Sequence, residues 1–271
     1  MQLPLSPQVF SILSALIAEH AGLHFGVEHM SVFGDKIGGR AVEAGFESLL
    51  DYYYFLRYDP GGRAELDTLL ESLVVNETYL FRELKALETM VSEFILPAVT
   101  EGRRPRIWCA ASSTGEEPHT VAMLLAARGI LEQVDLIASD VSVQALERAQ
   151  SGRFSRRAIR QTIPGFAERW LDVTERGVAI SPHLTKAIAW RRINLMDDAI
   201  IASLGVFDVV LCRNVLIYFS DATTRRIIDR LSGVLRPNGA LFVGISESLL
   251  RFGSPLICEE KNGVFLYKKP S

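Results

Sequence analysis

The chain has 271 residues, 48% of them hydrophobic, and its 29 basic and 32 acidic side chains leave a net charge of −3. This length accommodates one large α/β domain and a smaller one, and the low charge argues against nucleic acid as a partner. Two stretches depart from the average. Residues 1–70 hold four basic and nine acidic side chains, whereas residues 150–192 hold nine basic and three acidic ones, so the second stretch suits an acidic partner.

The cysteines Cys109, Cys212 and Cys258 are odd in number and lack paired spacing, which predicts buried thiols rather than disulfides. No lysine or arginine precedes Lys36, so the positive region of a secretory signal is missing. No uncharged apolar run approaches membrane-spanning length, and we expect no direct membrane insertion. These features predict a cytoplasmic protein. The five histidines show no metal-ligand spacing, and no metal is expected.

Apolar side chains recur at helical spacing through the first hundred residues, which predicts a helical domain at residues 1–73. A linker and a covering helix would follow at residues 74–105, with the helix ending at Pro97. The stripes that support these helices are Phe10, Leu13, Leu16 and Ile17; Phe46, Leu49, Leu50 and Tyr53; Leu66, Leu69, Leu70 and Leu73; and Leu87, Met90, Val91, Phe94 and Ile95.

From Arg106 onward, short apolar runs alternate with helical segments, as is typical of a parallel sheet built from βαβ units. Residues 151–192 are too long for a plain crossover and contain mixed turns, so we expect an inserted subdomain with short strands there. The expected strands are 107–110, 134–139, 207–212 and 240–243, and the expected helices are about 118–128, 142–150 and 223–235. The sequence therefore predicts an α/β fold.

The segment from Trp108 to Pro118 resembles a nucleotide-binding strand-to-helix turn, but Gly115 is its only glycine. A turn that holds a diphosphate needs closely spaced glycines and a helix N-terminus free of negative side chains. Here Glu116 and Glu117 lie at that N-terminus, where they would repel phosphate and could attract a cation. The favoured ligand is S-adenosylmethionine. Complementation of the helix dipole explains Glu117 equally well, and both explanations can hold.

Asp140 ends the second strand, where a doubly wound sheet places the acid that accepts hydrogen bonds from ribose hydroxyls. The alternative is an N-cap for the helix that begins near Ser142. Arg213 and Asn214 follow a later strand and should emerge at the carboxyl edge of the sheet. If that segment is helical, Tyr218 shares a face with Asn214, unless Tyr218 only packs against its apolar neighbours.

Asn76, Thr78 and Arg82 precede the last helical stripe. Thr78 could be a simple helix N-cap followed by first-turn acids. Arg82 is more informative, because it follows three apolar residues and is a fixed cation that would be costly to bury without an anion.

Five motifs, in this order, resemble those of the chemotaxis receptor glutamate methyltransferases, and the likeness covers nearly the whole chain. They are Asn76–Glu83, Ala110–Pro118, Ala138–Asp140, Asn194–Leu195 and Cys212–Phe219. The resemblance implies an N-terminal all-α domain and a Rossmann-like S-adenosylmethionine-dependent methyltransferase domain at 106–271, with a small β insertion at about 151–192. Carried over by motif, the cofactor contacts would be Asn76, Thr78, Arg82, Glu117, Asp140, Asn194, Leu195, Arg213 and Asn214, with Arg82 and Tyr218 nearest the methyl-transfer site.

The resemblance also implies the reaction, which is methyl transfer to glutamates on the cytoplasmic helices of methyl-accepting chemotaxis receptors, with S-adenosylhomocysteine as the product. A glutamate with a pKa of about 4.3 is already ionised at neutral pH, so no general base is needed. Arg82 and Tyr218 are expected to orient it. One departure concerns docking: family members can meet receptors through a basic N-terminal domain, but residues 1–70 are acidic here, which makes residues 150–192 the alternative surface.

Two other functions compete with this interpretation. The pocket could bind S-adenosylmethionine as a regulator without transferring its methyl group, although the presence of Arg82 and Tyr218 argues against that. The acceptor could also be a small molecule or nucleic acid, of which nucleic acid is disfavoured by the low net charge. A dehydrogenase is disfavoured by the missing glycines.

Overall fold

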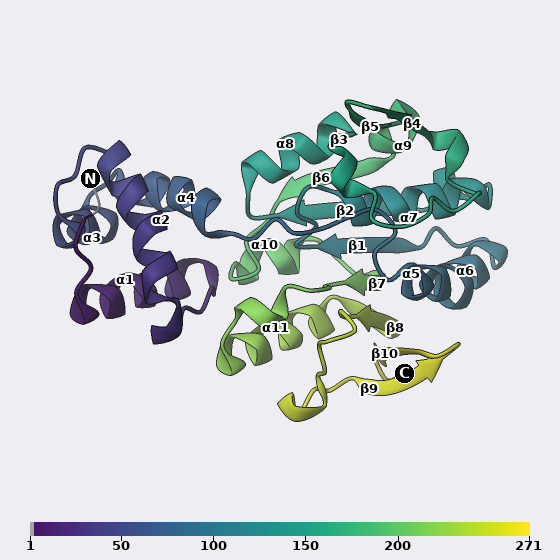
Figure 1. Ribbon diagram of the computed structural model, residues 1–271. Coiled ribbons are helices and arrows are strands. Elements are labelled where there is room, and N and C mark those ends of the chain that lie inside the picture. The colour runs from purple at the N-terminus through teal and green to yellow at the C-terminus, as the bar shows by residue number, and fades with distance from the viewer. Residues whose placement is uncertain (1–2) are drawn as a thin grey trace. The chain divides into compact units, whose positions relative to one another are not determined.

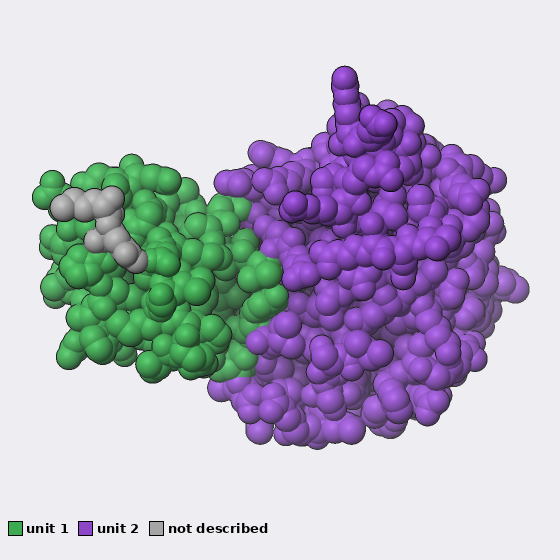
Figure 2. Space-filling view, viewed as in Figure 1, with its two compact units in different colours: residues 1–75, 218–220 green, residues 76–217, 221–271 purple. Residues whose placement is uncertain are grey.

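The computed structural model describes residues 3–271, and the chain divides into two compact units, coloured separately in Figure 2. Unit 1 runs to Val75 and also takes Tyr218–Ser220, and unit 2 comprises Asn76–Ile217 and Asp221–Ser271. The described part of unit 1 contains the helices α1 (Pro7–Ala21), α2 (Met30–Glu43), α3 (Leu49–Tyr58) and α4 (Gly62–Leu73).

The first helical segment of unit 2 continues further than the sequence predicted. α5 (Leu84–Met90) passes into a π-helical turn at Val91–Ile95 and then into α6 (Leu96–Thr100), so the prediction that the helix ends at Pro97 was wrong. Because proline has no backbone N–H, a normal α-helix would lose a hydrogen bond at this point. The wider turn, in which the Leu96 N–H donates to the Val91 carbonyl, lets the helix continue through the proline.

The centre of unit 2 is a seven-stranded sheet whose labels run down Figure 1 in the order β6-β2-β1-β7-β8-β10-β9. The first five strands are parallel to one another, and β10 runs antiparallel to both of its neighbours, β8 and β9. The strand bounds are β6 Ile188–Arg192, β2 Asp135–Asp140, β1 Arg106–Ala110, β7 Phe207–Leu211, β8 Leu235–Phe242, β10 Val264–Lys268 and β9 Ile257–Lys261. The predicted α/β fold with a mostly parallel sheet is confirmed.

Helices cover the sheet as expected for parallel strands, whose side chains are buried on both faces. Every residue of β7 is buried, as are four of the five residues of β1. The helices that alternate with the strands are α7 (Glu116–Ala127), α8 (Val143–Ser151), α10 (Asp198–Ser203) and α11 (Asp221–Gly233). α7 and α8 pack against β2 and β6, and α11 packs against β8.

The strand order positions the candidate site. β1 lies between β2 and β7. The chain runs from β1 to β2 and β6 on one side of it, and then returns to β7 and β8 on the other side. Open α/β sheets bind their ligands at such a switch point, in the crevice outside the carboxyl ends of the strands. The segments that follow Ala110 and Leu211 meet at this edge.

The inserted region forms a second, three-stranded sheet of order β3-β5-β4 (Arg153–Phe154, Gly177–Ile180 and Leu171–Thr174), followed by the short helix α9 (Pro182–Lys186). The proposed limit of 192 lies too far along the chain, because β6 pairs in parallel with β2 and belongs to the main sheet. Another difference is at Leu235, which begins β8 instead of ending a helix.

Within residues 3–271, no helix is both long enough and apolar enough to span a bilayer. The same residues include no group of three or more histidine, cysteine, aspartate or glutamate side chains arranged to hold a metal ion.

His119 on α7 should make stability depend on pH. Its Nδ1 donates to the Gly115 carbonyl at 2.7 Å, and its Nε2 lies 3.1 Å from the Thr185 hydroxyl. Burial lowers the pKa of His119 to about 4. Because the unfolded histidine binds its proton near pH 6.5, stability is expected to fall by up to about 3 kcal/mol as the pH drops from 6.5 to 4.

Urea unfolding across this pH range, compared with a His119→Gln variant, measures that contribution. The variant should lose less stability on acidification, because its side chain does not titrate. Parallel pH profiles for the two proteins would show that His119 does not contribute.

Candidate active site

The loop between β1 and α7 has an unusual backbone. Ala111 and Ser113 adopt positive φ angles of 53° and 50°, and Gly115 adopts 92°. For residues other than glycine this left-handed conformation costs about 1–2 kcal/mol each, and such strain persists only where the surroundings fix it. The Ser112 N–H donates to the Ser139 carbonyl at 2.8 Å, which ties the loop to the end of β2.

Asp140 holds the same loop through its side chain. One carboxylate oxygen accepts the Ser113 N–H at 2.7 Å and the other accepts the Ser142 N–H at 2.9 Å. The alternative explanation, that Asp140 caps the next helix, is wrong, because Ser142 caps α8 through its own hydroxyl.

Gly115 cannot be replaced without strain. A Cβ there would lie 2.6 Å from the Cβ of Ala149 and 3.0 Å from a ring carbon of Trp190, and the φ of 92° disfavours any other residue. We expect Gly115→Ala to destabilise the protein by about 2–3 kcal/mol and to weaken S-adenosylhomocysteine binding. Chemical denaturation and calorimetry measure the two effects.

The matched control is Gly233→Ala, at the end of α11, where a Cβ meets nothing within 4 Å. It should change stability by less than about 1 kcal/mol. Equal effects of the two substitutions would contradict the packing argument.

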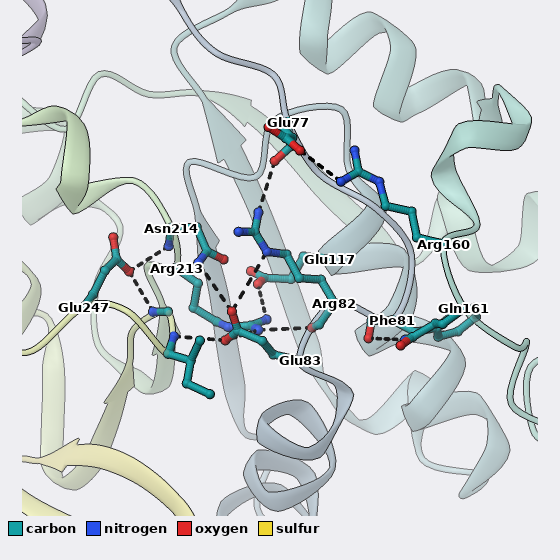
Figure 3. Close-up of polar contacts among 12 residues, drawn as sticks. Glu77, Phe81, Arg82, Glu83, Glu117, Arg160, Gln161, Arg213, Asn214 and Glu247 are labelled. Carbon is teal, nitrogen blue, oxygen red and sulfur yellow. Dashed lines mark hydrogen bonds and ion pairs between the residues drawn. The ribbon is translucent and has the colours of Figure 1, made fainter.

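A buried ion cluster lies beside this loop, and Figure 3 shows its members. The Arg213 guanidinium, with 1% of its side chain exposed, donates to Glu117 at 2.6 Å and to Glu83 at 2.9 Å. Its Nη2 also donates to the Arg82 carbonyl at 3.1 Å. One guanidinium therefore connects the loop before α5, the first turn of α7 and the end of β7.

Glu83 is the residue of this cluster that the sequence interpretation missed. Its carboxylate accepts from Arg213, from the Ile245 N–H at 3.2 Å and from the Asn214 side-chain amide at 3.4 Å, and it lies 3.9 Å from the Arg82 Nε. It contacts three of the predicted site residues. Its place directly after Arg82 in the quoted motif was the available signal.

Glu247 was also missed. Its carboxylate accepts from the backbone N–H groups of Asn214 and Gly244, both at 2.7 Å, and of Leu216 at 2.8 Å. These bonds fix Asn214 in a left-handed conformation with φ of 59°. They join the segments that follow β7 and β8, where no regular structure satisfies the backbone.

The two acids at the start of α7 differ from the expectation that they attract a cation. Burial raises the pKa of Glu117, although Arg213 opposes that rise, so its charge is already balanced. Burial likewise raises the pKa of Glu116, against hydrogen bonds from the Thr114 hydroxyl and its own backbone N–H. Glu117 is thus ion-paired, and Glu116 is held by hydrogen bonds. A bound phosphate is still disfavoured, because these side chains occupy the helix N-terminus that an anion would need.

Arg82 lies half-buried at the border of the cluster, with 29% of its side chain exposed. Its Nη1 donates to the Glu77 carbonyl at 3.1 Å, and its guanidinium lies 5.7 Å from the centre of the Tyr79 ring. The alternative role for Thr78 as an N-cap is wrong, because the helix begins only at Leu84. Asn76 lies nearby and accepts from the Ser113 hydroxyl at 3.0 Å.

The remaining predicted residues follow β6 and β7. The Ile193 N–H donates to the Asp140 carbonyl at 3.0 Å, which places Asn194 at the same edge. Asn194 accepts the Met196 N–H, and the carbonyl of the buried Leu195 accepts from Arg230 at 2.6 Å.

Tyr218 does not lie in unit 2, unlike the other predicted site residues. It belongs to unit 1, where its carbonyl accepts the His24 N–H at 2.8 Å. The conditional expectation that it shares a helical face with Asn214 does not hold, since Asn214 is left-handed and only Leu216–Tyr218 forms a 3-10 turn.

The donor set at this edge fits a nucleoside with an amino-acid arm. The Ser112 hydroxyl and the Arg213 Nε are buried and have no hydrogen-bond partner among residues 3–271, although buried polar groups are normally paired. The geometry thus defines a doubly wound α/β protein that gathers buried polar groups at its switch point, where this class of fold binds ligands.

Comparison with known proteins identifies the family. The model described as "CheR methyltransferase, SAM binding domain" matches residues 76–261, and the chain belongs to this family of S-adenosylmethionine-dependent methyltransferases. Chemotaxis protein methyltransferase 2 of Vibrio cholerae is 35% identical over 77% of this chain and 74% of its own length. Chemotaxis protein methyltransferase 1 of Pseudomonas aeruginosa is 32% identical, over 89% and 90%.

Another relative in Pseudomonas aeruginosa is the probable biofilm formation methyltransferase WspC. It is 33% identical over 83% of this chain, which spans about half (54%) of that longer protein. Among solved structures, the N-methyltransferase NodS from Bradyrhizobium japonicum matches 87% of this chain and 99% of its own at 15% identity and a TM-score of 0.39, a similarity too low to add to the assignment.

Proposed function

We propose that this protein methylates glutamate side chains on the cytoplasmic helices of methyl-accepting chemotaxis receptors. The observation that carries the proposal is the half-buried Arg82, whose guanidinium has five N–H donors and is only partly engaged by Glu77 and Glu83. A fixed, partly exposed guanidinium beside a nucleoside site suits an acceptor that is itself a carboxylate. The names of the chemotaxis relatives support the same substrate class.

Each site residue then has a proposed role. Asp140 would accept hydrogen bonds from the ribose hydroxyls, and Asn76, Thr78, Glu117, Asn194, Leu195, Arg213 and Asn214 would contact or surround the cofactor. S-adenosylmethionine, when bound, supplies an electrophilic methyl group on its sulfonium. Arg82 would orient the acceptor carboxylate. Because that carboxylate is already ionised at neutral pH, no residue is needed to remove a proton.

Arg82 should position the acceptor more than neutralise it. A very close ion pair would lower the nucleophilicity of the carboxylate, whereas a guanidinium held at the site can align it. Its own contacts with the Glu77 carbonyl and Glu83 restrict where it can point.

The direct test is incubation with labelled S-adenosylmethionine and cytoplasmic receptor fragments, followed by mass spectrometry of the receptor peptides. The expected product is a glutamate heavier by one methylene group, with a base-labile label. Saturable cofactor binding without any label on the fragments would identify a regulator instead. Label on another acceptor would retain the methyltransferase and reject the receptor substrate.

The relatives leave two signalling outputs open for the same chemistry, because some are named for chemotaxis and another for biofilm formation. Assaying fragments of the receptors from both kinds of pathway in parallel distinguishes them. Methylation of one set alone would assign the output.

A further inference from the structure

The inserted region contacts the segment that carries Arg82. The Leu80 N–H donates to the Ala158 carbonyl at 2.8 Å, and both residues are buried. The Gln161 side-chain amide donates to the Phe81 carbonyl at 2.7 Å, as Figure 3 shows. Leu80 and Phe81 are thus held by hydrogen bonds with residues that lie about eighty positions further along the chain.

Three side-chain contacts reinforce this attachment. Arg160 donates to the Glu77 carboxylate at 2.9 Å, and its guanidinium lies 4.8 Å from the centre of the Tyr79 ring. The Phe166 ring meets the Phe81 ring edge-on at 6.3 Å. Residues 158–166 therefore contact four residues in the stretch 77–81.

The segment needs external support because of its backbone. Phe81 and Glu83 adopt positive φ angles of 66° and 49°, and the helix α5 begins only at Leu84. Residues in this conformation keep it only where the surroundings hold them. The N–H of Phe81 donates to the Thr120 hydroxyl of α7 at 3.1 Å, so Phe81 is held through both of its backbone polar groups. Arg82 lies between the two strained residues, so its direction depends on them.

We propose that residues 158–166 form a positioning strap that fixes the 77–83 segment, and that Gln161 is a positioning residue for Arg82. The strap thus gives the inserted region a structural role, which is to hold another segment of unit 2 in place. Its effect on turnover rests on the proposed function, whereas its effect on the order of the segment does not. Gln161 is exposed, so its removal leaves the core intact.

Native-state amide hydrogen exchange tests the strap without any reaction. We expect Gln161→Ala to speed exchange at residues 77–83 by about tenfold, corresponding to the loss of one hydrogen bond, with exchange elsewhere unchanged. The matched control is Gln133→Ala, which removes an exposed glutamine that donates to a backbone carbonyl, that of Gly129, at 3.4 Å in the same unit. Unchanged exchange at residues 77–83 in Gln161→Ala would overturn the proposal.

A second pair of variants tests the ionic contact. Arg160→Ala should also speed exchange at residues 77–83, by several-fold. Arg104→Ala, which breaks an exposed ion pair with Asp135 at 2.6 Å, should leave that segment unchanged. If both arginine variants behave alike, the strap does not act through Arg160.

A double-mutant cycle tests whether Gln161 acts through Arg82. In the wild-type background, Gln161→Ala should lower kcat about five- to tenfold, with less change in cofactor affinity. In an Arg82→Ala background it should lower kcat no further. Equal losses in both backgrounds would show a merely structural effect. Wild-type protein that fails to methylate receptors would reject the proposed function, and the exchange result would still decide the strap.

Discussion

Replacing Arg213 with alanine is expected to destabilise the protein by about 3–5 kcal/mol, because it leaves buried carboxylates without their cation. The Arg213 side chain is 1% exposed and pairs with Glu83 and Glu117, whose side chains are only 20% and 16% exposed. Urea unfolding at neutral pH measures the loss. Arg251→Ala, which breaks an ion pair with Asp221 that is more than 60% exposed on both sides, should cost less than about 1 kcal/mol.

The pH dependence of the Arg213→Ala defect identifies its cause. Without the guanidinium, the pKa of Glu117 rises further and the pKa of Glu83 is no longer held below its usual value, so each carboxyl takes up a proton more readily in the folded variant. An acid whose pKa is raised in the folded state destabilises the protein most above that pKa, and the penalty shrinks as the pH falls from the folded pKa to the unfolded one. The difference from wild type should therefore shrink as the pH falls from 7 towards 5. A constant difference would indicate lost packing in place of unpaired charge.

Arg82→Ala is expected to lower kcat by about 100-fold while changing S-adenosylhomocysteine affinity much less, because a misplaced acceptor affects the reaction more than cofactor binding. Stability should change by less than about 1 kcal/mol, since the side chain is partly exposed and its hydrogen bond to the Glu77 carbonyl is 3.1 Å long. Steady-state kinetics and calorimetry separate the two effects.

The control for Arg82 is Arg128→Ala, an exposed arginine at the end of α7 that donates to the Leu124 carbonyl at 3.3 Å. It should keep wild-type kcat. Arg82→Lys should recover part of the activity, since it keeps the charge without the planar donor geometry. Wild-type turnover in Arg82→Ala, with unchanged cofactor affinity, would refute the proposed positioning role.

The sequence predicted the parallel sheet because its strands are short, apolar and separated by helices of ordinary length. The place of Asp140 at the end of β2 could also be predicted, since the apolar run of that strand stops there. The C-terminal hairpin was missed although Asn262–Gly263 is a strong turn signal between two strands. Both residues of that turn have positive φ, as such hairpins require.

The ion cluster could not be predicted in the same way. Glu83, Glu117 and Arg213 lie far apart in the sequence, and their pairing depends on how β1, β7 and α5 are placed. Glu117 was predicted to be available to a ligand, because no sequence pattern indicates that Arg213 pairs with it. The sequence interpretation also separated the insertion from the site, because no local pattern shows that Gln161 reaches the backbone of Phe81.

The outermost strands of the main sheet, β6 and β9, both carry charged residues at their ends, namely Arg191 and Arg192 on β6 and Glu259, Glu260 and Lys261 on β9. Charged side chains on an edge strand disfavour its pairing with a strand of another molecule, because the pairing would bring these charges close to a second chain. Growth of this sheet by addition of a second molecule is thereby discouraged, which guards the protein against aggregation through its exposed backbone.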